Sequence, residues 1–113
     1  MFKGLESQTF DIIKELVLKK NILISSHSYD ELAEDGLFVR DALDSISEAI
    51  VIEDYPNAFK GASVLLLQKD RNGNPIHTVW GIAKDKTEPA VLITAYIPSP
   101  LKWDKTFTRR TDA

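Results

Sequence analysis

The hydrophobic pattern of this chain changes its period near residue 49. Before that point, apolar residues such as Phe10, Ile13 and Val17 recur three or four positions apart, which is the spacing of one helix face. After it, the apolar runs are short, rich in β-branched residues and bounded by turn residues, which is typical of strands. We therefore expect helices at 7–20, 28–35 and about 38–47, followed by strands at 49–53, 63–68, 76–82 and 90–96.

A strong turn signal separates the second and third of these strands. Asn72-Gly73 is a residue pair that favours a tight β-hairpin, because both positions accept a positive φ. Helices followed by strands predict an α+β fold, with N-terminal helices packed on one face of an antiparallel meander sheet of about four strands. The short apolar run 22–24 is interpreted as a buried strand or an extended segment.

Length and composition limit the class of protein. A chain of 113 residues is long enough for one hydrophobic core, so residues 1–113 are expected to form a single domain. The absence of cysteine excludes disulfides, thiolate metal sites and cysteine nucleophiles. No apolar run approaches the roughly 20 residues of a membrane span, and residues 1–20 lack the pattern of a signal peptide. We expect a cytoplasmic protein with no membrane partner.

Charge is distributed unevenly along the chain. Between His27 and Asp54 there are nine acidic residues and one basic residue, Arg40, whereas the remainder has an excess of basic residues. The acidic segment is interpreted as two solvated helix faces rich in Asp and Glu. A phosphate-binding surface is then expected only on the basic, sheet-forming part of the chain.

His27 occupies a position of chemical interest, between the run 22–24 and a helix start. Ser28 and Glu31 match a capping box, in which the serine side chain reaches forward and the glutamate reaches back. A histidine at this corner can accept or donate a proton near neutral pH, or it can simply hydrogen-bond the neighbouring backbone. Both interpretations remain open from the sequence.

The segment that follows the last strand is basic and aromatic. Trp103 and Phe107, four residues apart, either pack a last helical turn onto the sheet or belong to a surface for an anionic partner such as nucleic acid. Lys102, Arg109 and Arg110 supply the positive charge that such a surface requires. His77, within the strand 76–82, is expected on the less buried sheet face, where it serves the sheet structurally or lines the same site.

These residues match the needs of RNA cleavage without a metal. That reaction requires an acceptor for the 2′-hydroxyl proton, a cation beside the phosphorane oxygens and a donor for the leaving 5′-oxygen. His27, Arg109 and Tyr96 are the candidate catalytic residues, with Lys102, Arg110 and His77 as candidate substrate-binding residues. No metal site is expected, because the two histidines lie fifty residues apart with no carboxylate at ligand spacing. No cofactor is expected either, since the chain has no phosphate-cradling glycine loop.

Several short motifs, in order, resemble the domain of unknown function 4258 family over roughly residues 22–110. They are His27-Ser28, Gly36-Leu37, Tyr55-Pro56, Pro75-Ile76-His77-Thr78-Val79, Ile93-Thr94-Ala95-Tyr96-Ile97-Pro98, Lys102-Trp103 and Arg109-Arg110. That family in turn resembles small bacterial toxins of the RelE-like group, compact α+β ribonucleases that cut without metal. The resemblance implies an RNA-cleaving toxin or a relative of one, with RNA or a cognate antitoxin as partner. It also places His27, Tyr96 and the arginines of the tail at the positions of interest.

Two other functions remain open from the sequence. The first is a non-catalytic interaction module that binds a basic protein partner through its acidic helices. The second is a small-molecule pocket under the sheet near Trp80 and Trp103.

Overall fold

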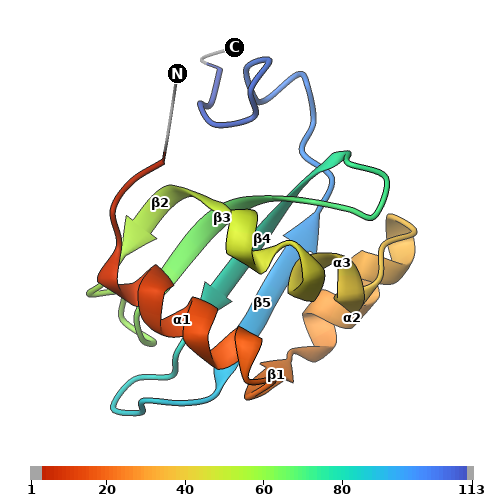
Figure 1. The fold of residues 1–113 in the computed structure, drawn as a ribbon. Helices are drawn as coiled ribbons and strands as arrows, with labels where there is room; N and C mark the ends of the chain where they lie inside the picture. The colour runs from red at the N-terminus through yellow and green to blue at the C-terminus, as the bar shows by residue number, and fades with distance from the viewer. Residues whose placement is uncertain (1–3, 112–113) are drawn as a thin grey trace.

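A five-stranded sheet with helices on one face forms the body of the protein (Figure 1). The computed structural model describes residues 4–111. The strand order is β1-β5-β4-β3-β2. The strands are β1 (Ile22–Ile24), β2 (Ile50–Tyr55), β3 (Ser63–Lys69), β4 (Pro75–Gly81) and β5 (Ala90–Tyr96). The predicted α+β class is confirmed.

Three α-helices and a 3₁₀ turn precede most of the sheet. They are α1 (Gln8–Leu18), α2 (Ser26–Glu34), α3 (Val39–Asp44) and η1 (Ile46–Glu48). α1 begins at Ser7, whose hydroxyl accepts a hydrogen bond from the Phe10 amide at 3.0 Å and so satisfies one free N–H of the first turn. Within residues 4–111 no helix is long and apolar enough to cross a membrane.

The sheet differs from the predicted meander in one respect. Strands β2 to β5 form the expected antiparallel meander, but β1 adds a fifth strand parallel to β5, with Leu23 opposite Val91. The sheet is therefore mixed. A parallel partner requires a long crossover, here all the chain between Ile24 and Ala90, so no local turn signal could have indicated it.

The two faces of the sheet carry separate apolar clusters. The larger one lies under the helices and includes Ile13, Leu66 and Trp80, which are fully buried. The smaller one lies on the opposite face, here called the back face, and consists of Ile52, Leu65 and Trp103 with partly buried neighbours. Trp80 and Trp103 belong to different clusters, so the two rings do not line one pocket under the sheet.

A β-bulge in each of two strands decides which side chains reach the back face. In β5 the register moves from Trp80 opposite Leu92 to Val79 opposite Thr94, which leaves Ile93 as the extra residue. Alternation then turns Thr94 and Tyr96 toward the back face, with Tyr96 directly opposite His77. A corresponding shift in β2 leaves Ile52 as the extra residue and places Glu53 opposite Leu65 of the back-face cluster.

The C-terminal segment 97–111, here called the tail, continues from β5 and packs on the back face. Figure 1 shows it as a loop beyond the end of the sheet. It contains turns and one bridge, Trp103 with Arg110, so the helical turn predicted around Trp103 and Phe107 is wrong. Asp104 explains this outcome, because its carboxylate accepts hydrogen bonds from the amides of Thr106 and Thr108 and stabilises a turn in place of a helix.

Candidate functional site

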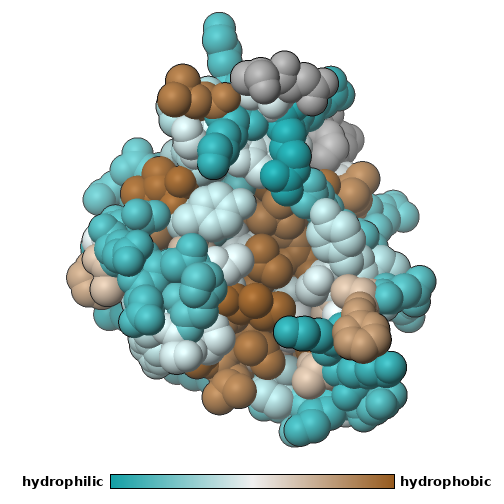
Figure 2. Space-filling model, turned by 180° about the vertical axis from the view of Figure 1, so that it is seen from behind, coloured by the Kyte–Doolittle hydropathy of each residue, from teal (hydrophilic) through white to brown (hydrophobic). Residues whose placement is uncertain are grey.

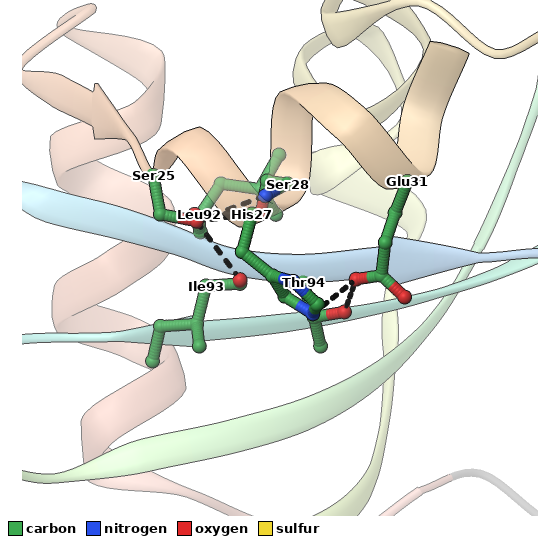
Figure 3. Close-up of polar contacts among 7 residues, drawn as sticks. All are labelled: Ser25, His27, Ser28, Glu31, Leu92, Ile93 and Thr94. Atoms are coloured by element: carbon green, nitrogen blue, oxygen red, sulfur yellow. Dashed lines mark hydrogen bonds and ion pairs between the residues drawn. The ribbon is translucent and has the colours of Figure 1, made fainter. Parts of the chain in front are cut away.

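The first turn of α2 is fixed to the edge of β5 by two serines. Ser25 is the N-cap, because its hydroxyl accepts from the Ser28 amide at 3.1 Å. The Ser25 and Ser28 hydroxyls donate to the carbonyls of Ile93 and Leu92, at 3.0 and 2.9 Å (Figure 3). The predicted capping box of Ser28 and Glu31 is therefore wrong, since Ser25 is the N-cap and Ser28 is the third residue of the helix, fully buried against the strand.

His27, in the first turn of α2, and Glu31, one turn further on, project toward β5 (Figure 3). The His27 Nε2 lies 3.0 Å from Glu31 Oε1, and the same carboxylate oxygen accepts a hydrogen bond from the Thr94 hydroxyl. The His27 side chain is 69% exposed, and its Nδ1 makes no hydrogen bond within residues 4–111. A ring that is held at one nitrogen and open to solvent at the other is suited to proton exchange with a ligand.

His77 lies on the back face, the less covered face on which it was expected, but its side chain is fully buried there. Its Nε2 lies 2.8 Å from the Phe107 carbonyl oxygen, which only accepts hydrogen bonds, so Nε2 carries the proton. Burial lowers the pKa of His77, and the charge of Arg110 lowers it further, whereas the Phe107 carbonyl and Glu53 act in the opposite direction. At pH 7, above this lowered pKa, the ring is neutral, and its Nδ1 accepts a hydrogen bond from the Tyr96 hydroxyl at 3.3 Å.

The tail closes over His77 through Trp103 and Arg110. The Trp103 ring stands edge-on to His77, with centroids 4.4 Å apart, and the Arg110 guanidinium lies 4.7 Å above the Trp103 ring. Arg110 donates two hydrogen bonds of 3.1 Å to the Glu53 carboxylate. This contact holds the pKa of Glu53 below its ordinary range, although partial burial acts against it.

Tyr96 lies between these two groups of charges. Burial raises the pKa of its hydroxyl, Arg110 lowers it, and the carboxylates of Glu53 and Glu31 raise it. Of the predicted site residues, Tyr96 and His77 are in direct contact, and Arg110 reaches His77 through Trp103. His27 belongs to a second group, which is bonded through Glu31 to Thr94, two residues before Tyr96 on the same face of β5.

Two predicted residues remain apart from this arrangement. The side chains of Arg109 and Lys102 are exposed and form no hydrogen bond or ion pair within residues 4–111. Only their backbones are engaged, for example where the Asp104 amide donates to the Arg109 carbonyl. Of the two tail arginines, Arg110 rather than Arg109 is thus the one in contact with the site.

Sequence reasoning missed three contributors, Glu53, Tyr55 and Thr94. The Tyr55 hydroxyl donates to Glu53 at 2.6 Å, and Thr94 anchors Glu31. Their alternation with apolar neighbours was a weak signal, because both strands contain a bulge that changes which residues share a face. Within residues 4–111, no three histidine, aspartate or glutamate side chains gather in a way that could hold a metal ion.

An apolar strip extends from this site down the back face (Figure 2). Its members are exposed or half-buried aliphatic residues of β1, β3, β4 and β5, namely Leu23, Leu67, Val79, Val91 and Ile93. At its lower end lies a groove of about 330 Å³, lined by Gly81, Val91, Ile93 and residues of the loop from Ala58 to Ser63. The site therefore opens onto a broad surface and not into a closed cavity.

The fold and the site define a small α+β domain whose polar side chains converge on the open face of a mixed sheet. The chain belongs to the DUF4258 family, described as a domain of unknown function, whose model matches residues 24–97. The match covers α2, α3 and all five strands except the first two residues of β1, and it ends where the tail begins. Comparisons with curated proteins and with solved structures found no significant match.

Proposed function

We propose that this protein is a metal-independent ribonuclease related to the RelE-like toxins. The observation that carries the proposal is the placement of the His27 ring. It is open to solvent and held by Glu31, beside the strand face that also presents Tyr96. A solvent-accessible histidine supported by a carboxylate is a common general acid or base.

The proposed reaction uses the RNA's own 2′-hydroxyl as nucleophile. Its oxygen attacks the adjacent phosphorus, the bond to the 5′-oxygen breaks, and the products are a 2′,3′-cyclic phosphate and a 5′-hydroxyl. His27 moves one of the two protons involved. In this proposal Arg110, whose side chain is 61% exposed, contacts the phosphate by exchanging part of its bond to Glu53 for a phosphate oxygen.

The test is cleavage of a single-stranded RNA oligonucleotide by purified protein in the presence of EDTA. We expect products ending in a 2′,3′-cyclic phosphate, and His27→Ala should lower the rate by about 10²-fold or more. Tyr29→Ala is the matched control, because Tyr29 is an exposed residue of the same helix that makes no side-chain hydrogen bond within residues 4–111. If wild-type protein at a concentration equal to that of the RNA produces no cleavage, the proposal fails.

A second candidate function is supported by the outer surface of the helices. Asp30, Glu34, Asp44 and Glu48 are exposed, and none forms an ion pair within residues 4–111. Such a surface suits an interaction module that binds a basic segment of a protein partner. The second candidate requires no catalysis.

The second candidate is tested with a deca-arginine peptide. Binding should weaken steeply with salt and should weaken again in the double variant Asp30→Asn, Glu34→Gln. Glu15→Gln is the control, since Glu15 is an exposed acid that is paired with Lys19 on α1. Equal affinity of all three proteins would exclude the acidic surface as the binding site.

A further inference from the structure

We propose that Tyr96, positioned by His77, accepts the 2′-hydroxyl proton of the substrate and passes its own proton to His77. Tyr96 is the catalytic residue in this step and His77 is its positioning residue. The inference rests on the proposed ribonuclease function and deepens it. It assigns general-base catalysis, which removes the 2′-hydroxyl proton, to the Tyr96–His77 pair. General-acid catalysis, which protonates the leaving 5′-oxygen, is left to His27.

The direction of the Tyr96 hydrogen bond carries the inference. The Phe107 carbonyl fixes the proton of His77 on Nε2, so that Nδ1 has only a lone pair to offer. The Tyr96 hydroxyl must therefore donate toward His77, over 3.3 Å. Its oxygen then presents lone pairs, and no proton, to a ligand on the back face.

This direction of the hydrogen bond favours a Tyr96 hydroxyl that accepts a proton from the substrate over one that donates a proton to it. If Tyr96 gave its proton to a leaving group, a phenolate would remain beside a neutral ring, at a site where the pKa of the hydroxyl is already raised by burial. If it instead receives the 2′-hydroxyl proton, its own proton moves along the existing hydrogen bond to His77 Nδ1. The tyrosine stays neutral throughout, and the ring becomes an imidazolium.

The groups that face His77 determine how well that imidazolium is tolerated. Its Nε2–H keeps its bond to the Phe107 carbonyl, and the Glu53 carboxylate attracts the new charge, whereas burial and Arg110 oppose it. A phosphate bound at Arg110 would offset part of that opposition, because it adds negative charge next to the arginine. Substrate binding and proton uptake by His77 would then assist each other.

The remaining proton comes from His27. Protonated at both nitrogens, with Nε2–H directed at Glu31, its ring donates from Nδ1 to the departing 5′-oxygen. One proton is taken up by the Tyr96–His77 pair and one is released by His27, so the step balances without an added reactant. Exchange with water resets both rings after the product leaves.

The first measurement concerns the ring nitrogens and needs no activity. In ¹⁵N-histidine-labelled full-length protein at pH 7, the resonances of His77 should show a protonated Nε2 and an unprotonated Nδ1. Tyr96→Phe should shift the Nδ1 resonance, because it removes that hydrogen bond, while the resonances of His27 stay in place. A proton on Nδ1, or an Nδ1 resonance indifferent to Tyr96→Phe, overturns the inference.

The second measurement is the pH profile of RNA cleavage. Wild type should give a bell-shaped profile, whose acid limb reports protonation of His77 before substrate binds. Tyr96→Phe should lower the rate by about 10²-fold or more. His77→Asn, which retains an acceptor near Tyr96 but does not titrate, should lower the rate and abolish the acid limb.

The outcomes separate this inference from the proposed function. If wild type cleaves RNA and Tyr96→Phe cleaves it equally fast, the relay is overturned while the ribonuclease stands. An acid limb that persists unchanged in His77→Asn overturns the role of His77. If wild type cleaves no RNA, both the proposed ribonuclease function and the proton relay as a catalytic step are overturned. This holds whatever protonation the ¹⁵N resonances of His77 report.

Discussion

At the scale of single residues, His77 is the group whose environment departs furthest from that of a surface histidine. It is fully buried, both ring nitrogens are bonded, and Trp103 stands against its ring. The sequence indicated a strand position for His77, and the structure places it in β4. It could not indicate the burial, because the residues that cover His77 come from the tail, thirty positions later in the chain.

The lowered pKa of His77 predicts that stability depends on pH. The folded state holds the ring neutral, so His77 contributes stability above its ordinary pKa of 6.5, and this is lost as pH falls through the lowered folded value. The free energy of unfolding should therefore decrease between pH 7 and 5, by at most about 1.4 kcal/mol per pH unit. Urea denaturation at several pH values between 7 and 5 measures this change in the free energy of unfolding.

Two variants identify the residue responsible. His77→Gln should remove the slope between pH 7 and 5, at the cost of a lower stability overall, whereas His27→Gln should retain it. Glu53 does not contribute in this window, because its pKa lies below an ordinary value of 4.5. A slope that survives in His77→Gln would contradict the assignment.

At the scale of elements, the sequence predicts the order and type of most helices and strands but not the irregularities that build the site. The turn at Asn72-Gly73 depends only on the backbone preferences of these two residues, and the structure confirms the hairpin of β3 and β4 around it. The extra residues Ile52 and Ile93 are β-branched and fit a regular strand equally well, so nothing local marks them as bulges. Yet without the Ile93 bulge, Tyr96 would face the helices and not His77.

Gly61 shows how tightly the loop between β2 and β3 packs against the end of β4. Its φ is +127°, and a Cβ built there would lie 2.1 Å from the Ile82 carbonyl oxygen. Gly61→Ala should therefore destabilise by about 2 kcal/mol or more, from backbone strain together with a clash against main chain.

Gly73→Ala supplies the matched comparison. Its φ is also positive, at +82°, but a Cβ there meets nothing within 4 Å, so only the strain of about 1 kcal/mol applies. Thermal or urea unfolding of both variants measures the difference. If both variants lose the same free energy of unfolding, the loop between β2 and β3 can move to accept a side chain at position 61. It would then not fix the shape of the groove beside Ile93.

At the scale of the whole molecule, the tail lies beyond the matched family region and closes one end of the back face. The family match ends at residue 97, whereas Trp103, Phe107 and Arg110 lie beyond it and cover His77. The basic and aromatic composition of the tail was visible in the sequence. Its contacts were not, because they depend on which face of the sheet it reaches.

The tail should therefore open as a unit when its anchor is removed. Trp103→Ala removes the ring that contacts both His77 and Arg110, and burial losses of this kind cost about 3–5 kcal/mol when the site cannot collapse. Amide hydrogen exchange should accelerate at Asp104 and Thr111, whose N–H groups are bonded within the tail, while amides of β3 and β4 keep their protection. Trypsin should also cut faster at Lys105 and Arg109.

Leu101→Ala is the control, because Leu101 is 81% exposed and should leave exchange in the tail unchanged. The fluorescence of Trp80, buried under the helices on the other face, reports whether the sheet remains folded. If exchange accelerates in β3 and β4 as much as in the tail, the tail is part of the folding unit of the sheet. In that case His77 would remain covered for as long as the protein is folded, and a ligand would reach only Tyr96, Arg110 and His27 at its margin.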